Sequence, residues 1–321
     1  MATSDGSRVI AIEEHYFDPA LSGRFTGRDD RMPPPIRDRL LDVGEGRLKA
    51  MDEGGIDVQV LSHGAPATQK LDAETGVAVA REVNDRLAGI VAASPDRFQG
   101  FAALPTADPE ASADELDRCV GEHGFRGAMV HGLTNGAFLD EKRFWPIFER
   151  AAALGVPLYM HPSIPHEDVI QAYYADYIEA FPGLLTAGWG FTVETATQGI
   201  RLVLSGVFDA YPDLRIVLGH LGEGLPFLLW RIDQALARTE TPLDSFRETF
   251  REHFYITTSG NFSDPALLCS AMEMGTDRIL FSVDYPFVVN KDGTDWMERI
   301  PFSTEDRRKI LHGNAERLLG L

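Results

Sequence analysis

The sequence predicts a (β/α)8 TIM barrel of the α/β class, and three observations lead to this prediction. The chain has 321 residues, a length that single barrels of this kind commonly reach. Eight short apolar runs recur along it, separated by longer segments with helical spacing. The runs are continuously apolar, which is typical of parallel strands covered on both faces. We therefore expect one barrel domain over residues 1–321.

The eight expected strands are short and rich in β-branched and aromatic residues. In chain order they span residues 8–13, 57–61, 98–103, 127–130, 157–160, 215–218, 254–258 and 278–283. An open doubly wound sheet is the alternative arrangement of such units. No GxGxxG follows the first strand and no Walker loop occurs, which favours the closed barrel.

Helix signals occupy several of the segments between the strands. The expected helices span residues 75–92, 108–124, 140–154 and about 303–319. Asp108 and Pro109 are a cap and a first-turn proline, and Gly155 is a natural left-handed helix stop. Two segments are longer than ordinary loops, namely residues 17–40 and residues 163–190. We expect a long loop after strand 1 and a helical insertion after strand 5.

The composition excludes several classes of protein. Lys and Arg number 30 and Asp and Glu number 49, which gives a net charge of −19 and argues against nucleic acid and anionic membranes as partners. Cys119 and Cys269 lie far apart, so neither a disulfide scaffold nor a zinc finger is encoded. No apolar leader opens the chain, and no apolar run reaches the roughly 18 residues of a membrane span. We expect a cytoplasmic protein.

Histidines gather at the C-terminal ends of the expected strands, where barrels of this type carry their chemistry. Five of the nine histidines fall at such ends, namely His15, His63, His131, His161 and His220. Chance placement would scatter them through helices and surface loops. Imidazoles and carboxylates collected at one rim indicate a divalent-metal site.

The first strand ends in Glu13 and His15, which lie two residues apart. Both side chains therefore point to the same face and can enter the barrel mouth, while Glu14 faces outward. A buried carboxylate needs a partner, so we interpret the pair as metal ligands. The alternative is a structural hydrogen-bonded pair.

Three further strand ends supply candidate site residues. His161 precedes a proline, and Asp284 directly follows a buried strand with nothing basic near it in sequence. His220 lies three residues before Glu223, which could orient one ring nitrogen. The structural alternatives are a histidine bonded to a loop carbonyl, a rim histidine held by a helix-start glutamate, and an aspartate that caps the following loop.

The motifs that these residues form resemble those of the amidohydrolase superfamily. Within it, they are similar to the motifs of the metal-dependent aromatic-acid decarboxylases of the γ-resorcylate (2,6-dihydroxybenzoate) type. The resemblance rests on Glu13-x-His15, His161-Pro162, the segment 219–224 and Asp284-x-Pro286-Phe287. Similar stretches at residues 97–105, 256–262 and 277–282 extend it through nearly the whole chain.

The resemblance implies a role for each matching position. Glu13, His15, His161 and Asp284 would hold one divalent ion, commonly zinc or manganese, with magnesium also suited to such ligands. His220 would sit beside the metal, oriented by Glu223. Arg231 would meet the substrate carboxylate or a ring substituent, and Phe287 would pack on the aromatic ring. The family likeness also suggests a homodimer or homotetramer.

Two departures from the superfamily pattern bear on the reaction. The first motif is ExH instead of HxH, and no lysine stands near the end of the fourth strand, which favours one metal ion over two. His131 stands where the nearest relatives are expected to carry asparagine, so the ring of the substrate would bear different groups near this substrate-binding residue.

We therefore expect a carboxy-lyase that removes CO2 without oxidation from a hydroxylated aromatic acid of the 2-hydroxybenzoate type. Asp284 is the expected acid that protonates the ring carbon, with His220 and Glu223 as a relay. The main alternative is a mononuclear metal-dependent hydrolase of a lactone, amide or ester, in which a metal-activated water attacks. A ligand-binding barrel without catalysis is a third possibility.

Overall fold

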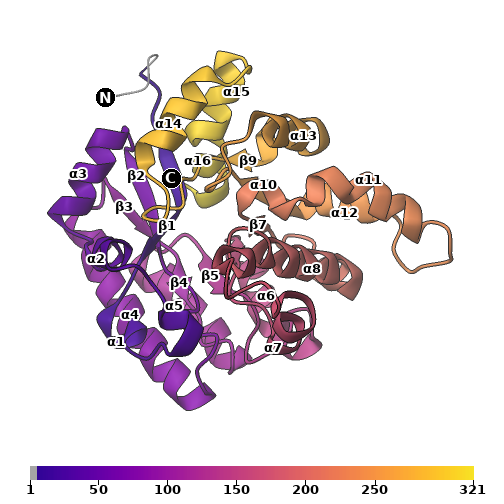
Figure 1. The fold of residues 1–321 in the computed structure, drawn as a ribbon, viewed down its shortest axis with the longest axis horizontal. Helices are drawn as coiled ribbons and strands as arrows, with labels where there is room; N and C mark the ends of the chain where they lie inside the picture. Colours follow the sequence, from indigo (N-terminus) through magenta and orange to yellow (C-terminus); the bar gives the residue numbers. More distant parts are fainter. Residues whose placement is uncertain (1–5) are drawn as a thin grey trace.

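The computed structural model describes residues 6–321 and forms a closed barrel of parallel strands surrounded by helices (Figure 1). The strands are β1 Ile10–Tyr16, β2 Val58–His63, β3 Phe98–Gly100, β4 Ala102–Ala103, β5 Ala128–His131, β6 Leu158–His161, β7 Ile216–Leu218, β8 Phe254–Thr257 and β9 Ile279–Leu280. Only Phe101 separates β3 from β4, so the two segments occupy one position and the barrel has eight. The predicted fold class is confirmed.

Backbone hydrogen bonds close the barrel between its first and last strands. The amide of His15 donates to the carbonyl of Tyr285 at 2.8 Å, and the amide of Asp284 donates to the carbonyl of Glu13 at 3.2 Å. At the break between β3 and β4, the amide of Phe101 donates back to Leu61 at 2.9 Å. Strand β1 and the segment after β9 thus meet at the wall of the barrel that carries Glu13 and Asp284.

Helices cover the outside of the barrel between successive strands (Figure 1). The helices of three or more turns and their shorter neighbours are α1 Pro19–Ser22, α2 Pro34–Leu41, α3 Glu45–Gly54, α4 Ala73–Ala93, α5 Pro109–His123, α6 Trp145–Leu154, α7 Glu167–Val169, α8 Gly190–Ser205, α9 Val207–Ala210, α10 His220–Glu223, α11 Leu225–Leu236, α12 Phe246–His253, α13 Asp264–Met274, α14 Asn290–Arg299, α15 Thr304–Arg308 and α16 Asn314–Leu319. Short 3-10 or π turns lie at Gly27–Asp30, Lys142–Phe144, Ile170–Tyr174, Pro182–Leu185, Thr276–Arg278 and Lys309–Gly313.

Most of the expected elements are confirmed, including the long segment after β1. The helical insertion expected after the fifth strand follows β6, which is the fifth strand of the barrel because β3 and β4 share one position. Asp108 caps α5 by accepting from the amide of Ala111, and Gly155 ends α6 in a left-handed conformation. The third predicted helix begins later than expected, at Trp145, after a 3-10 turn. A π turn divides the last predicted helix into α15 and α16.

The last strand is shorter than its sequence predicts. Residues 281–283 were expected to continue it, but their amides bond elsewhere. Ser282 donates to Oγ1 of Thr258 at 3.0 Å, and Val283 donates to the carboxylate of Glu14 at 2.9 Å. Side-chain acceptors thus replace the backbone ladder where the chain turns into the loop that carries Asp284.

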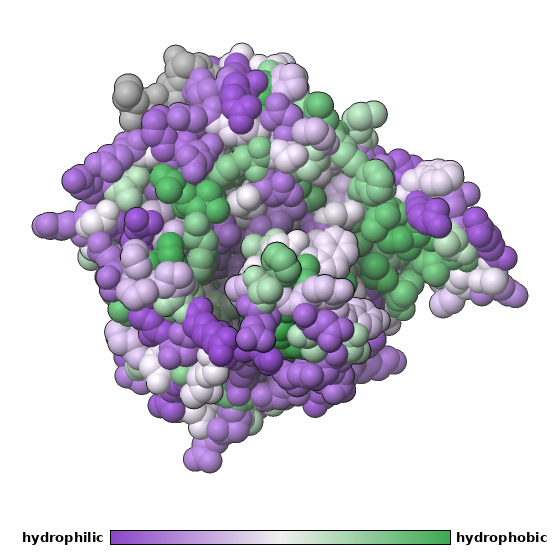
Figure 2. Space-filling model, in the orientation of Figure 1, coloured by the Kyte–Doolittle hydropathy of each residue, from purple (hydrophilic) through white to green (hydrophobic). Residues whose placement is uncertain are grey.

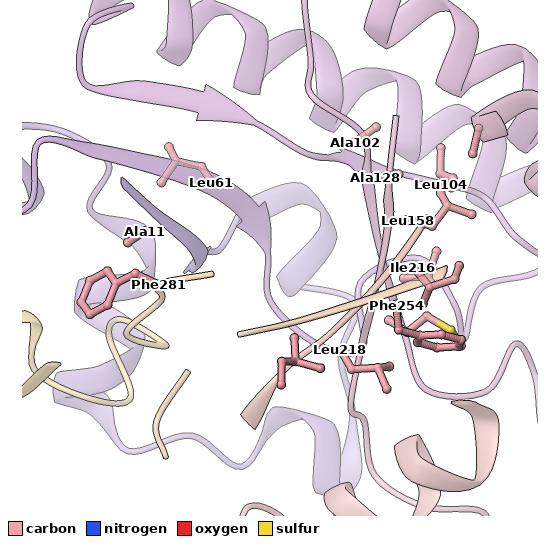
Figure 3. Packing of buried hydrophobic residues seen from close by; sticks show 14 of the residues in the cluster. Ala11, Leu61, Ala102, Leu104, Ala128, Leu158, Ile216, Leu218, Phe254 and Phe281 are labelled. Carbon is pink, nitrogen blue, oxygen red and sulfur yellow. The ribbon is translucent and has the colours of Figure 1, made fainter. Parts of the chain in front are cut away.

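Two apolar layers lie on the two faces of the strands. Residues that point into the barrel, such as Ile12, Val60 and Val217, form the inner cluster. Residues that point outward pack against the helices, and Figure 3 shows members of this outer cluster on successive strands. The alternation follows from the two-residue period of a strand, except in β1, where a register shift between Ala11 and Glu14 lets Ile12 and Glu13 both face the interior. Within residues 6–321, no helix combines the length and apolarity needed to cross a membrane.

We expect Gly54→Ala to destabilise the protein, because Gly54 ends α3 against the start of α14. A Cβ at this position would lie 2.3 Å from Cβ of Asn290, in a contact where neither backbone can move freely. Overpacking of this kind costs about 1–3 kcal/mol in the free energy of unfolding, measured by urea denaturation. Gly89→Ala is the matched control, since nothing lies within 4 Å of the added Cβ and the change should stabilise α4 by roughly 1 kcal/mol. Equal effects of the two changes would contradict this account.

Candidate functional site

Four side chains converge at the C-terminal mouth of the barrel. Glu13 and His15 come from β1, His161 ends β6, and Asp284 follows β9. One ligand atom from each residue lies within 4.8 Å of every other. All four were predicted as metal ligands, and the structure brings them together. Figure 2 shows the molecular surface hollowed over the barrel strands near the centre of this face.

Glu13 is held by three hydroxyl groups, all on one of its carboxylate oxygens. Tyr159, Thr257 and Ser259 donate to Oε2 of Glu13, the bond from Thr257 measuring 3.2 Å. The other oxygen, Oε1, is buried and has no hydrogen-bond partner. It lies 3.3 Å from Nε2 of His161. The hydroxyls therefore orient the free oxygen toward the cluster.

The two histidines of the cluster are oriented in the same manner. Nδ1 of His15 lies 3.2 Å from the hydroxyl of Ser62, and Nδ1 of His161 lies 2.7 Å from the carbonyl of Pro162. Each Nε2 therefore faces the cluster, and that of His15 is buried without a partner. Oδ1 of Asp284 is unpartnered as well. Three orphaned buried atoms on mixed imidazole and carboxylate ligands fit a divalent cation.

The charge states of the cluster also suit a cation. Burial acts to raise the pKa of Glu13, but the neighbouring His220 and His161 lower it on balance. Burial likewise opposes ionisation of Asp284, yet the proximity of His15 and His220, at 3.4 and 3.8 Å, holds its pKa below the usual range. Burial and the proximity of His161 lower the pKa of His15, so this imidazole stays neutral. Two ionised carboxylates and a neutral imidazole are ready to bind a metal.

His220 and Glu223 form a second group that touches the cluster. Nδ1 of His220 lies 2.7 Å from Oε1 of Glu223, and its Nε2 lies 3.8 Å from Oδ2 of Asp284. Thr192 on α8 holds the other oxygen of Glu223 at 2.8 Å. Burial acts to lower the pKa of His220, but the charges of Glu223 and Glu13 raise it well above the ordinary value. His220 is therefore a protonated imidazole beside Asp284.

Backbone strain collects in the loops that carry these groups. His220, Glu223 and Asp284 have φ values of 51°, 55° and 73°, in the left-handed region that non-glycine residues rarely adopt. Gly219, just before His220, must lack a side chain, because a Cβ there would lie 2.9 Å from Oε2 of Glu13. The chain thus holds functional side chains in conformations that the surrounding contacts must enforce.

Two predicted substrate-binding residues lie next to the cluster. The ring of Phe287 is 43% exposed, and its centre lies 5.9 Å from that of His15. His131 is buried, and its Nδ1 lies 3.0 Å from Nδ1 of His161. Burial and the nearby His161 lower the pKa of His131 well below the ordinary value, so it is neutral. Phe287 can meet an aromatic ring, whereas the ring of His131 is turned toward His161.

Two other residues are not brought to the cluster. Arg231 is exposed on α11, and among residues 6–321 no hydrogen bond or ion pair joins it to any residue of the site. Its contact with substrate stays a prediction. His63, one of the five rim histidines, stacks on Phe17 with ring centres 5.3 Å apart and bonds to the carbonyl of Gly64 at 2.9 Å. It supports the segment after β1.

Sequence reasoning missed the residues that orient the ligands. Tyr159 stands two positions before His161 on β6, and Thr257 stands two before Ser259 at the end of β8. The two-residue strand period therefore contains the signal that these hydroxyls share the inner face with the ligands.

A cavity of about 510 Å³ lies at the mouth, between the ends of β5 and β6 and the segment after β1. Two ion pairs join its lining residues. Arg28 binds Glu167 of the insertion at 2.8 Å, and Lys70 binds Asp29 at 2.6 Å. The segment after β1 is thereby tied to the segments that follow β2 and β6. Both long segments line this cavity.

Comparison with known proteins places these observations in context. A family model described as Amidohydrolase matches residues 15–321. Gamma-resorcylate decarboxylase from Polaromonas sp. (strain JS666) is 43% identical over 97% of this chain and 98% of that protein.

Solved structures of aromatic-acid decarboxylases match the chain as well. The crystal structure of a dihydroxybenzoic acid decarboxylase from Polaromonas sp. JS666, with bound manganese and the inhibitor 2-nitroresorcinol, matches with a TM-score of 0.89 and 43% identity over 98% of this chain and 97% of that one. 5-Carboxyvanillate decarboxylase from Novosphingobium aromaticivorans, complexed with manganese and 4-hydroxy-3-methoxy-5-nitrobenzoic acid, matches with a TM-score of 0.92 and 33% identity over 99% of this chain and 97% of that one.

We expect the stability of the protein to fall as the pH drops from about 6.5 toward about 4, in part because of His63. Burial lowers the pKa of His63 from 6.5 to about 4. In this window the unfolded chain binds a proton at His63 and the folded chain does not, so acid favours unfolding by up to about 3 kcal/mol at this site. His63→Phe keeps an aromatic ring against Phe17 but removes the titration. Urea unfolding at several pH values should give a smaller pH slope for the variant, and equal slopes would refute the assignment.

Proposed function

The chain belongs to the amidohydrolase family and is a metal-dependent, non-oxidative decarboxylase of hydroxylated aromatic acids, and we propose that its substrates are 2-hydroxybenzoates of the 2,6-dihydroxybenzoate type. Relatives that act on such acids share about the whole length of the chain. The observation that supports the proposal best is the position of Asp284. It is one of the four ligands of the cluster, and it lies 3.8 Å from His220 of the His220–Glu223 pair.

We infer that Glu13, His15, His161 and Asp284 hold one divalent cation, with manganese favoured because it is bound in the solved relatives. When bound, the cation supplies positive charge that fixes the anionic substrate and stabilises negative charge in the transition state. The chain has a net charge of −19, but surface charges are screened beyond about 8 Å at physiological salt.

The residues of the chain would then bind and protonate the ring. Phe287 offers an aromatic face for the ring at the edge of the cluster. The ring carbon that bears the carboxylate accepts a proton from Asp284. The bond from that carbon to the carboxylate then breaks, CO2 leaves, and the electron pair of the bond returns to the ring.

The proton comes from His220. Asp284 is ionised at rest, because His15 and His220 hold its pKa low, so it must receive a proton before it can donate one. His220 is protonated, and its Nε2 lies 3.8 Å from Oδ2 of Asp284. Glu223 stabilises the charged imidazole. Transfer from His220 to Asp284, followed by transfer to the ring carbon, gives general acid catalysis with a reservoir behind the acid. Solvent protons then recharge His220, so the net reaction consumes one proton and releases one CO2.

The alternative, hydrolysis of a lactone, amide or ester, is not favoured. Curated relatives that are 35–43% identical over 97% of this chain are decarboxylases, and the cluster contains no second metal position among the described residues. A substrate screen separates the two reactions, since a hydrolase would release an acid and an alcohol or amine without CO2.

We expect Asp284→Asn to lower kcat for a 2-hydroxybenzoate by about 10²–10⁴-fold, since a side chain that cannot carry the proton replaces the acid. The assay follows CO2 release and ultraviolet loss in manganese-loaded enzyme, with chelated enzyme expected to be inactive until manganese is restored. Asp306→Asn, in the first turn of α15, is the control and should leave kcat unchanged. Full activity of Asp284→Asn would refute the role of Asp284, and absence of CO2 from every hydroxybenzoate tested would refute the function.

We further propose that the protein is a homodimer or homotetramer that buries the outer face of α11. Phe227 and Trp230 on this helix are 79% and 62% exposed, and Trp189 before α8 is exposed too. Figure 2 shows hydrophobic residues gathered around α11. A second copy of the chain would remove this apolar surface from water.

Trp230→Glu should shift the protein toward a smaller species in size-exclusion chromatography with light scattering, because the interface would then bury a charge. Met272→Glu is the control, since Met272 is exposed on α13 and its change should leave the mass unaltered. A monomeric wild-type protein, or a Trp230→Glu variant with unchanged mass at all concentrations, would contradict the proposal.

A further inference from the structure

A buried polar network lies directly behind the metal ligands, on the side of β1 that faces the helices. Its members are Glu14 of β1, Gln59 of β2 and Arg47 of α3, each with no exposed surface. The sequence correctly indicated that Glu14 points away from the barrel interior. The structure adds that this side is the closed layer between strands and helices. Burial there raises the pKa of Glu14 to about 8, so its carboxyl group needs hydrogen-bond partners.

Glu14 binds the backbone on both sides of Asp284. The amide of Val283 donates to Oε1 of Glu14 at 2.9 Å, and the amide of Tyr285 donates to Oε2 at 3.2 Å. The amide of Asp284 itself donates to the carbonyl of Glu13 at 3.2 Å. Three consecutive amides of the loop are therefore bound by two consecutive residues of β1.

The other end of the network holds the same two segments. Gln59 donates to Oε2 of Glu14 at 3.2 Å, and Arg47 donates to Oε1 of Gln59 at 3.2 Å. Arg47 also donates to the carbonyl of His15 and lies over the ring of Tyr285, with its Cζ 4.9 Å from the ring centre. The network thus links the backbone of His15 to the backbone of the Asp284 loop.

We propose that Glu14 is a positioning residue that sets Asp284 in the site. Asp284 has a φ of 73°, a left-handed conformation that a residue other than glycine keeps only where its surroundings enforce it. The two amide bonds to Glu14 flank Asp284 and enforce that conformation. The carboxylate of Asp284 is consequently aimed at His15 and at His220, at 3.4 and 3.8 Å.

This inference rests on the proposed role of Asp284 as ligand and acid, and it differs from a purely structural role for Glu14. A carboxylate that only supports the fold would, when changed, lower the free energy of unfolding and leave the folded site intact. A positioning residue changes the site in the molecules that remain folded. Partners behind metal ligands typically alter metal affinity or activity by about 10–100-fold.

The test is Glu14→Gln, which keeps the size of the side chain but turns an NH2 group toward one of the amide donors. Manganese affinity of the metal-free protein is measured from the free Mn²⁺ signal in electron paramagnetic resonance. We expect a dissociation constant about 10–100-fold weaker. At saturating manganese, kcat should fall about 10–100-fold while KM changes much less, because Asp284 is displaced and the ring-binding surface is not.

Glu115→Gln is the matched control. Glu115 is a buried carboxylate on α5 that accepts from Asn84 at 2.8 Å and from Arg118 at 2.7 Å, away from the site. Its loss should lower the free energy of unfolding and leave manganese affinity and kcat unchanged. Folding of every variant is checked by circular dichroism and urea unfolding.

The outcomes separate the possibilities. If Glu14→Gln is destabilised like Glu115→Gln but keeps wild-type manganese affinity and kcat, the proposal is wrong. If Glu14→Gln does not fold, Glu14→Asp provides the test, because it keeps the carboxyl group but is one CH2 too short to hold both amides. Weaker manganese binding in Glu14→Asp supports the proposal, and unchanged binding overturns it. If the wild-type protein releases no CO2 but Glu14→Gln still binds manganese more weakly, the proposed reaction fails and the positioning role stands.

Discussion

The site depends on two carboxylates that the fold forces together in a buried place. The charge of Asp284 acts to raise the pKa of Glu13, and burial penalises the ionised forms of both. Their ionisation is stabilised by His15, His161 and His220, which surround them. Positive charge is therefore the requirement around which the barrel mouth is arranged, and a divalent cation satisfies it more fully than imidazoles alone.

Each ligand is held from behind by neighbouring polar groups, and the hydroxyl of Ser62 holds His15. Hydroxyls from β6 and β8 hold Glu13, a backbone carbonyl holds His161, and backbone amides bound to Glu14 hold the loop of Asp284. The ligand atoms are thereby oriented before a metal arrives. Such preorganisation lowers the reorganisation needed for binding and for catalysis.

The sequence predicted the barrel and the ligand set because both follow from short-range rules. Glu13 and His15 share a face through the strand period, and strand ends of parallel units meet at one rim. The sequence predicted that Glu14 faces away from the barrel interior but not its contacts, because sequence alone does not distinguish solvent from the layer between strands and helices. Arg231 is assigned by the resemblance alone, and the structure leaves it exposed on α11. The shortened β9 depends on side-chain acceptors from β1 and β8, which no local pattern predicts.

The ligands also lie at opposite ends of the chain, since β1 supplies two of them and the loop after β9 supplies a third. More than 260 residues separate His15 from Asp284, so their meeting is among the most non-local contacts that the protein makes. Local βα units can form while the polypeptide is still being synthesised, but the cation pocket cannot exist until the final segment has left the ribosome. Metal acquisition would accordingly be a late, post-synthetic event, and a prematurely terminated polypeptide would lack the pocket altogether.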